Sequence, residues 1–329
     1  MKVALTGAAG HLGAAILQEL NSRNIEVKAL IRDNDTRALK DLQAGIVKGN
    51  ILHAGVLENL IQDCDTVIHS AALISVNGDR NGLVYKTNVE GTRMAIETAL
   101  QAGVKRFIQI SSIHAYQQQP SLEILDEQRK PVTDSGFAYD RSKQMGKEIA
   151  LAAYEKGMEV LVIHPTSIIG PYDHKPSLMG QVIIDLYRGR LPFIFNGGFD
   201  FCDCRDVAHA IVNGLTMGKP GESYLLAGKW YSLKELALFL SAASSKKINP
   251  VALSPAIARL GLPIIKTLAW IKKEEPLYTV EALDALFTGN RLISSEKAKT
   301  DLNYNIRPFE ETILDTFGWF TNNGYLDRN

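Results

Sequence analysis

The chain has little cysteine and no excess of charge of either sign. Its 329 residues include three cysteines, Cys64, Cys202 and Cys204. This odd, sparse set excludes the disulfide framework of a small secreted protein, so we expect a reducing compartment, the cytoplasm. The 36 Lys and Arg residues balance the 36 Asp and Glu residues. No net field therefore attracts nucleic acid or an anionic membrane, and neither is expected as a partner.

Long apolar runs are also missing. The segment from Met1 to Gly7 lacks the apolar length and cleavage site of a signal peptide. The longest apolar region, 251–271, is interrupted by two prolines and by the charges of Arg259 and Lys266, which argues against a membrane-spanning helix. We expect a pair of amphipathic helices packed on the protein there, and a helix lying in a membrane interface is the less favoured alternative.

Short apolar runs alternate with helical patterns in the first half of the chain. Such alternation predicts an α/β fold with a doubly wound parallel Rossmann sheet, whose ligand lies outside the carboxyl ends of the strands. Hydrophobic residues at 46% and charged residues at 22% are typical of a globular protein. We predict strands at Val3–Thr6, Val27–Ile31, Gly45–Lys48, Thr66–His69, Arg106–Ile110 and Val160–His164, and helices at His11–Ser22, Val56–Gln62, Leu83–Ala102 and Tyr139–Lys156.

The regular alternation ends at Pro165, after which proline and glycine separate shorter pieces. We therefore predict a dinucleotide-binding domain at residues 1–165 and a smaller mixed substrate-binding domain at residues 166–329. Phe201–Cys204, followed by a helix capped at Asp206, and Ser223–Ala227 resemble sheet strands. We expect the segments near 201–217 and 223–227 to return to the first domain.

A glycine-rich turn joins the first predicted strand to the first helix. Gly7, Gly10 and Gly13 follow a Gly-x-x-Gly-x-x-Gly spacing. Glycines in this context permit a tight turn and close approach of the backbone to a pyrophosphate, which the N–H groups of the helix N-terminus bind. The alternative is a plain glycine turn, but its place between an apolar strand and an amphipathic helix favours a dinucleotide.

The end of the second predicted strand bears on the choice of cofactor. An arginine there can pair with the 2′-phosphate of NADP, whereas an acidic residue binds the ribose 2′-OH of NAD. Arg32 and Asp33 are both present, so both cofactors stay open. Arg32 comes first, and Lys28 and Arg37 could add positive charge, so the order favours NADP.

A phenol and an ammonium group lie one helical turn apart at Tyr139 and Lys143. A neighbouring cation stabilises a phenolate and so lowers the pKa of tyrosine toward the range useful for proton transfer. Ser111 and Ser112 end the fifth predicted strand and could hydrogen-bond a substrate carbonyl, although ordinary capping of the strand end is the plainer explanation.

Several separately placed motifs follow one another along the chain: Gly7–Gly13, Ile68–Ala72, Asn88–Thr92, Ser111-Ser112, Tyr139–Lys143 and His164–Thr166. In this order they resemble the motifs of the extended short-chain dehydrogenases/reductases, the NAD-dependent epimerase/dehydratase family, and the resemblance covers essentially the whole chain. Within that family, Val27–Arg32 and Gly170–Pro176 most resemble the bacterial dihydroflavonol 4-reductase-like group, which includes hopanoid-associated sugar epimerase-like members.

The resemblance implies a catalytic set of Ser112, Tyr139 and Lys143. Tyr139 would protonate the carbonyl, Lys143 would bind the nicotinamide ribose and lower the pKa of Tyr139, and Ser112 would orient the carbonyl. Ser112 is preferred to Ser111 because Tyr116 follows it by four residues. The implied cofactor-binding residues are Thr6, Gly7, Ala9, Gly10, His11, Leu12, Gly13, Arg32, Asn50, Ile51, Ser70, Ala71, Ala72, Asn88, Tyr139, Lys143, His164, Thr166 and Ser167.

Some positions depart from the family pattern. His164 stands where many members have arginine, and Asn50 where an aspartate near the adenine is usual. Ile113 and His114 follow Ser112, where 4,6-dehydratases carry the acidic pair that eliminates water, so a dehydratase is disfavoured. A reductase is preferred, a nucleotide-sugar epimerase that retains NAD is the alternative, and a sensor or scaffold without turnover is a second alternative.

The loops expected to face the substrate carry apolar and aromatic residues and few basic ones. This composition favours a small or hydrophobic aldehyde or ketone as substrate. The diphosphate of a nucleotide sugar would need more basic side chains to bind it. The substrate-side candidates are His114, Tyr172, His174 and Phe195; the two histidines could instead be solvated loop residues, and the aromatic side chains could belong to the core.

No metal site is expected, because Cys202 and Cys204 have too few soft partners for zinc. The resemblance also implies a homodimer through the helices at 83–102 and 139–156. The alternative is that the apolar residues of these helices face the protein's own sheet.

Overall fold

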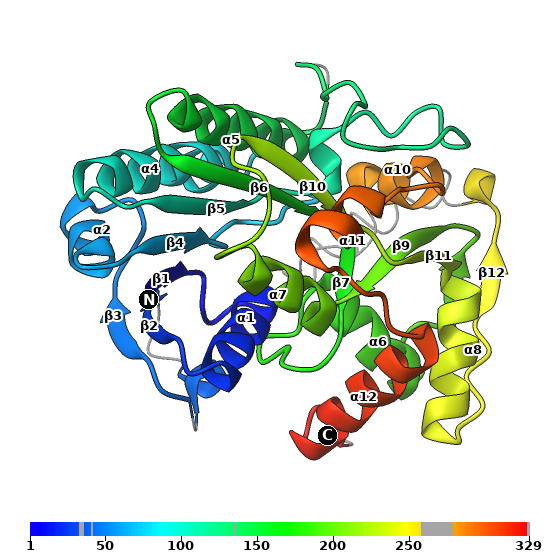
Figure 1. The fold of residues 1–329 in the computed structure, drawn as a ribbon. Coiled ribbons are helices and arrows are strands. Elements are labelled where there is room, and N and C mark those ends of the chain that lie inside the picture. The colour runs from blue at the N-terminus through cyan, green and yellow to red at the C-terminus, as the bar shows by residue number, and fades with distance from the viewer. Residues whose placement is uncertain (33–35, 41, 135, 258–278, 328–329) are drawn as a thin grey trace.

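The computed structural model describes residues 1–32, 36–40, 42–134, 136–257 and 279–327. Its centre is a seven-stranded parallel sheet in the order β10-β6-β5-β4-β1-β2-β3 (Figure 1). The strand order reverses between β1 and β4, so the crevice that binds ligands in such sheets lies at the carboxyl ends of these two strands. The strands are β1 (Lys2–Thr6), β2 (Glu26–Ile31), β3 (Gly45–Lys48), β4 (Thr66–His69), β5 (Arg106–Ile110), β6 (Glu159–Pro165) and β10 (Glu222–Leu226).

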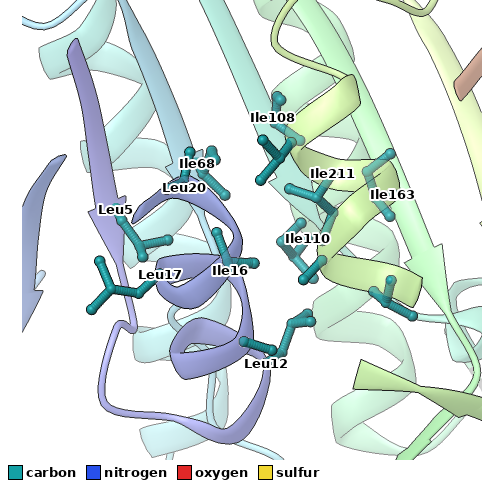
Figure 2. Close-up of a cluster of buried hydrophobic side chains, with 14 of the residues drawn as sticks. Leu5, Leu12, Ile16, Leu17, Leu20, Ile68, Ile108, Ile110, Ile163 and Ile211 are labelled. Carbon is teal, nitrogen blue, oxygen red and sulfur yellow. The ribbon is translucent and has the colours of Figure 1, made fainter. Parts of the chain in front are cut away.

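Helices cover both faces of this sheet, as the doubly wound fold predicted from the sequence requires. On one face lie α1 (His11–Ser22) and α7 (Cys204–Asn213), and on the other α2 (Ala54–Ile61), α4 (Gly91–Gln101) and α5 (Ala138–Tyr154). Successive strand residues point to opposite faces, so Val3 and Leu5 pack toward α1 and Ala4 packs toward α2. Figure 2 shows the first of these cores, in which leucine and isoleucine side chains of α1 meet those of the strands.

The helix predicted at Leu83–Ala102 is interrupted. The chain forms α3 (Leu83–Tyr85), then one π-helical turn at Lys86–Glu90, and then α4. Such turns insert an extra residue into a helix and are frequent at functional sites. Here the turn contains Asn88, whose buried side chain bonds the loop that follows β4.

The second half of the chain builds two small sheets and a separate core. β7 (Ser167–Ile169), β9 (Gly198–Asp203) and β11 (Lys229–Ser232) form a sheet in the order β11-β9-β7, and β8 (Phe193–Phe195) pairs with β12 (Val251–Leu253). Buried residues of these strands pack with α6 (Leu178–Arg188), α8 (Leu233–Ser244), α10 (Val280–Thr288) and α12 (Phe309–Asn322). Hydrogen bonds between Ser232 and Glu235 form the capping box that begins α8.

Two expectations for this half were wrong. The strand predicted at Phe201–Cys204 belongs to β9, which pairs with β7 and β11 and not with the main sheet, because β10 already occupies the edge beside β6. The helix that follows is capped by Asp203, whose side chain accepts the N–H of Arg205. Asp206 lies one turn further on and bonds Arg307 instead. The division of the chain at residue 165 stays a prediction.

The apolar region at 251–271 is described only in part. Its first three residues form β12, not a helix, and residues 258–278 lie outside the described residues. In the part of the chain that the structure describes, no helix is long and apolar enough to cross a membrane. The short helix α11 (Glu296–Leu302) packs beside β10 and completes the core under α7.

Candidate active site

The glycine-rich turn after β1 lies directly against the end of β4. Gly7 adopts φ +73°, and a Cβ atom on it would lie 2.7 Å from the backbone nitrogen of Ala71. A Cβ atom on Gly13 would lie 2.0 Å from the carbonyl oxygen of Gly7. Real side chains do not fit at such separations, so these two glycines bring strand, turn and helix into close contact.

The N-terminus of α1 is open to an anion. Its N-cap is the exposed Gly10, which provides no side-chain cap, and the first turn of the helix carries no acidic residue. The first N–H groups of a helix have no partner within the helix, and the helix dipole adds partial positive charge there. The backbone of the turn therefore fits a dinucleotide diphosphate, as the sequence predicted.

The side chains of the turn contribute less than its backbone does. Leu12 is buried in the core between α1 and the sheet (Figure 2). The Nε2 atom of His11 lies 3.0 Å from the carbonyl oxygen of Pro171, which ties the start of α1 to the loop after β7. Ala9 is partly buried beside the same core. For these three residues we expect contact with a diphosphate through the backbone.

The loop after β4 is fixed by polar side chains beneath it. The N–H of Ala71 donates to the hydroxyl of the fully buried Thr6 at 3.1 Å. The side chain of Asn88 bonds both backbone groups of Leu73, at 2.7 and 3.0 Å, and also donates to the hydroxyl of Ser142. Ser70 and Ala71 are partly exposed and Ala72 is exposed beside the glycine turn. Asn88, only 3% exposed, positions this loop and the start of α5.

Ser112, Tyr139 and Lys143 come together at the carboxyl ends of β5 and β6. Ser112 follows β5 by two residues, and its hydroxyl accepts the N–H of His114. Tyr139 and Lys143 lie in the first turns of α5, with the Lys143 Nζ 5.9 Å from the centroid of the Tyr139 ring. The hydroxyl of Ser111 donates to the carbonyl of Lys143 at 3.2 Å, so Ser111 supports α5 while Ser112 lies beside the phenol.

The electrostatics of this trio differ from the expectation that Lys143 lowers the pKa of Tyr139. Burial raises the pKa of the Tyr139 phenol well above its ordinary value, and a hydrogen bond with Ser112 opposes this only in part. The Lys143 ammonium donates to the carbonyl of Ile110 at 3.0 Å, and burial lowers its pKa to about 8. In this structure Tyr139 is therefore a protonated phenol, the form that a proton donor needs.

His114 lies beside Tyr139 and pairs with the next residue of α5. Its Nδ1 is 3.1 Å from a carboxylate oxygen of Asp140, and its ring meets the Tyr139 ring edge-on at 6.0 Å between centroids. Burial lowers the pKa of His114, but the hydrogen bond and charge of Asp140, together with the charge of Asp284, outweigh burial and raise it. The substrate-side role of His114 stays a prediction.

His164 does not fit its expected contact with the cofactor. Its side chain is fully buried, with Nδ1 3.0 Å from the Ser112 carbonyl and Nε2 3.3 Å from the Ser223 hydroxyl. The carbonyl can only accept, so Nδ1 carries the proton and the neutral ring bridges β5, β6 and β10. Burial lowers the pKa of His164 to about 3. The residue supports Ser112 from within the protein.

Three of the four substrate-side candidates lie elsewhere. Tyr172 packs against the core of α1 and α7, and His174 lies edge-on to Trp319 of α12. Phe195, 6% exposed, belongs to the core of the second half. The loop after β7 runs along α1 and α12, and Phe195 faces the second core, so this packing gives no support to a substrate role for these three residues, which stays a prediction.

Thr166 and Ser167 lie where β6 passes into β7. The Thr166 hydroxyl donates to Asp200 at 2.7 Å, and the N–H of Gly228 donates to the same carboxylate oxygen. Asp200 is 7% exposed, and burial raises its pKa. The carboxylate thus fixes Thr166 at the site, while Ser167 stays partly exposed. Sequence reasoning missed Asp200, since its partner lies 34 residues away in the chain.

The cofactor-selecting region has Arg32 exposed at the end of β2, while Asp33 lies outside the described residues. Lys28 does not add charge there, because its ammonium donates to two carbonyl groups at the end of α2. Arg37 donates to the hydroxyl of Tyr325. Lys48, missed from the sequence, is exposed at the end of β3 opposite Ile31; its position as the last residue of a neighbouring strand was the available signal.

The residues expected near the adenine of the cofactor follow β3. The side chain of Asn50 accepts the N–H of Leu52 at 3.0 Å, which shapes the turn. Ile51 is 7% exposed and packs so closely on Gly91 that a Cβ atom there would lie 2.5 Å from it. Asn50 is therefore the exposed member of this pair, and Ile51 anchors the turn to α4.

Comparison with known proteins identifies a family and several relatives. The model of the NAD dependent epimerase/dehydratase family matches residues 3–227. Sterol demethylase protein B of Methylococcus capsulatus is 28% identical over 331 residues, which cover 99% of this chain and 100% of that protein. A putative dihydroflavonol 4-reductase of Synechocystis is 29% identical, with 98% of this chain and 95% of that protein covered. The crystal structure of gox2253 has a TM-score of 0.85 at 29% identity and covers 99% of both chains.

Proposed function

The chain belongs to the NAD-dependent epimerase/dehydratase family of extended short-chain dehydrogenases/reductases, and we propose that it is an NADPH-dependent reductase of a small or hydrophobic aldehyde or ketone. Ser112, Tyr139 and Lys143, brought together at one sheet edge, carry this proposal. The similarity to the putative dihydroflavonol 4-reductase, which covers 98% of this chain and 95% of that protein, also supports a reductase.

The residues of the chain can perform the proton half of a carbonyl reduction. The bound nicotinamide would supply the hydride. The hydroxyl of Ser112 orients the carbonyl oxygen, and the protonated phenol of Tyr139 donates its proton to that oxygen. Lys143, whose ammonium lies at the carboxyl end of β5, would hold the nicotinamide ribose, and the open N-terminus of α1 would hold the pyrophosphate.

The charge around the site favours a neutral carbonyl compound over a nucleotide sugar. Asp140 and Asp284 act on His114, and Asp140 also raises the pKa of Glu281, although burial is the larger cause of that shift. A sugar diphosphate would be repelled by these carboxylates, since like charges at short range destabilise a complex. Ile113, buried at 6% exposure, cannot supply the acid that a dehydratase needs after Ser112.

The preference for NADPH rests on Arg32. It is exposed at the end of β2, with Lys48 at the end of the neighbouring strand. An arginine can form a bidentate pair with the 2′-phosphate, which NADH lacks. We expect Arg32→Ala to weaken NADPH binding about 10-fold or more, as the loss of a charge-assisted hydrogen bond implies, and to leave NADH binding within about twofold. Equal losses for both nucleotides would contradict this role.

The proposed reaction is tested with Tyr139→Phe and with Tyr154→Phe as its matched control. Both residues lie on α5, and Tyr154 is 47% exposed at its far end. A panel of aldehydes and ketones is assayed with NADPH and NADH after removal of copurified nucleotide. Tyr139→Phe should lower turnover at least about 100-fold, the ordinary contribution of a positioned acid, with unchanged NADPH binding. Tyr154→Phe should match the wild type.

Other outcomes decide among the remaining functions. Full activity in Tyr139→Phe would refute the assigned chemistry. Tightly retained NAD with conversion of sugar nucleotides would favour the epimerase, and nucleotide binding without turnover of any carbonyl would favour a sensor or scaffold. The homodimer and the cytoplasmic location stay predictions. The apolar residues Ala95, Ala99 and Ala153 of α4 and α5 pack on the protein's own sheet.

A further inference from the structure

Three histidines surround the catalytic strand ends, and their environments differ. His69 ends β4, is 1% exposed, and has its Nδ1 3.0 Å from the hydroxyl of Thr6. Burial lowers the pKa of both His69 and His164 to about 3, so both rings are neutral at physiological pH. Neither can carry a proton between the site and water.

His114 differs from both in exposure and in charge. Its side chain is 32% exposed, and that of its partner Asp140 is 19% exposed. The Nδ1 of His114 faces the Asp140 carboxylate, and the same ring lies edge-on against Tyr139. Thus one side of the imidazole contacts a carboxylate, another contacts the catalytic tyrosine, and part of it reaches solvent.

The turn that carries His114 is held in place. Ser112 caps the single 3-10 turn formed by Ile113–Ala115, and its hydroxyl accepts the N–H of His114. The N–H of Tyr116 then bonds the carbonyl of Ile113. The backbone of His114 is therefore fixed to the residue that orients the carbonyl.

The charged groups that face His114 are acidic. Asp140 comes from α5, and Asp284 comes from α10 with Glu281 one turn before it. Glu281 accepts the N–H of Gly78 through one oxygen, while its other oxygen is buried without a hydrogen-bond partner among the described residues. Asp140 and Asp284 stabilise an imidazolium, and their combined effect on the pKa of His114 exceeds the opposing effect of its burial.

Tyr139 needs a source of protons. After it donates, its phenolate is left in a buried place where the negative charge is disfavoured. The Lys143 ammonium donates to the carbonyl of Ile110 and is expected to hold the nicotinamide ribose with its other donors. Among the described groups, His114 combines contact with the Tyr139 ring, exposure to solvent and a carboxylate partner.

We propose that the His114–Asp140 pair is a proton relay that recharges Tyr139 after each reduction. This inference rests on the proposed reductase function. The carbonyl carbon gains the hydride of NAD(P)H and the carbonyl oxygen gains the phenol proton. The phenolate then takes a proton from the His114 imidazolium, directly or through one water, and the neutral imidazole takes a proton from solvent. The balance is one carbonyl, one NAD(P)H and one proton converted to one alcohol and one NAD(P)⁺.

The test uses His114→Gln and Asp140→Asn, with His53→Gln as the matched control. His53 is an exposed histidine before α2. His114→Gln should lower kcat about 10- to 100-fold, at or below the ordinary range for a proton-transfer group, and leave the KM of the carbonyl within about twofold. His53→Gln should equal the wild type.

The pH dependence separates a relay from a structural role. The relay needs a protonated His114, so kcat of the wild type should fall as pH rises through the pKa of His114. In Asp140→Asn this fall should begin at lower pH, because the carboxylate that raises this pKa is gone. In His114→Gln the fall should disappear. Imidazole added to His114→Ala should restore part of kcat in proportion to its concentration.

A second readout does not depend on turnover. The titration of His114 in the free protein, followed by NMR with labelled histidine, should show a pKa above that of an exposed histidine, and this pKa should drop in Asp140→Asn. Wild-type kcat and an unchanged pH profile in His114→Gln would overturn the relay and leave the reductase intact, as would a change confined to KM. Absence of carbonyl turnover in the wild type would refute the proposed function and the relay together.

Discussion

Substitution of Gly13 by alanine should show whether the steric contact of the added methyl group outweighs the higher helix propensity of alanine. In an unconstrained helix interior, alanine is favoured over glycine by about 0.8–1 kcal/mol. At Gly13 the added methyl would lie 2.0 Å from the carbonyl oxygen of Gly7 and 2.9 Å from the Cα of Ala8. Because both contacts are backbone atoms, α1 must move away from the turn after β1.

The magnitude follows from comparing this position with Gly318. Gly318 lies within α12, and a Cβ atom there would meet nothing within 4 Å. Gly318→Ala should therefore raise the free energy of unfolding by about 0.5–1 kcal/mol. Gly13→Ala should lower it by about 1–3 kcal/mol, the ordinary cost of forcing an extra methyl group into a packed site. The two alanine variants should thus differ by about 1.5–4 kcal/mol.

Nucleotide binding should also differ between Gly13→Ala and Gly318→Ala. Displacement of α1 moves the N–H groups that would hold the pyrophosphate, and each lost hydrogen bond to a charged group costs about 1.5–3 kcal/mol, or tenfold and more in Kd. We would measure urea unfolding by circular dichroism and NADPH binding by nicotinamide fluorescence. If Gly13→Ala were stabilised like Gly318→Ala and bound NADPH with the wild-type Kd, the close packing of this turn would be wrong.

Two further predictions concern buried polar groups beneath the site. Asn88→Ala should lower the free energy of unfolding by about 1–3 kcal/mol, because both backbone groups of Leu73 lose their side-chain partner; a urea titration measures this, and a change below about 0.5 kcal/mol would contradict it. Stability should also fall on acidification. His69 and His164 have pKa values of about 3 in the folded protein and about 6.5 when unfolded, so the unfolded chain binds more protons between these values. Each histidine should then contribute a loss of up to about 1.4 kcal/mol per pH unit below pH 6.5. Urea titrations at pH 7 and pH 5 measure this loss. The free energy of unfolding should change less between these pH values in His164→Gln than in the wild type, and an equal change would contradict the lowered pKa of His164.

Much of the main sheet followed from local rules. The alternation of apolar strands and amphipathic helices predicted the first six strands with ends within one residue of those observed. The turn at Gly7 and the spacing of Tyr139 and Lys143 were predictable for the same reason, because each depends on residues close together in the chain. The doubly wound class predicted from this pattern is confirmed by the strand order.

Contacts distant in the sequence were not accessible in this way. His164 is bonded to groups 52 and 59 residues away, and the sequence near it does not reveal these partners. Tyr172 and Phe195 were expected to face the substrate because their loops follow the sheet edge. The sequence did not show that Tyr172 packs beside α1 and that Phe195 belongs to the second core. Asp140 was present in the tyrosine motif, but only the fold shows that it meets His114.

The loop after β4 connects the cofactor side of the site to the substrate side. Thr6 bonds this loop at Ala71 beside the glycine turn. Five to seven residues later, the hydroxyl of Thr279 donates to the carbonyl of Val76, and Glu281 accepts the N–H of Gly78. The side chains that make these two bonds, Thr279 as donor and Glu281 as acceptor, both lie at the start of α10.

Because these bonds join one short loop to two distant parts of the chain, α10 cannot be displaced without straining the segment that passes beside the dinucleotide turn. The same helix presents Asp284 toward His114. The position of α10 therefore bears on the shape of the loop after β4 and on part of the charge around His114. The hydrogen bond and charge of Asp140, on α5, raise the pKa of His114 more than the charge of Asp284 on α10 does, so these two helices together distinguish His114 from the two neutral histidines.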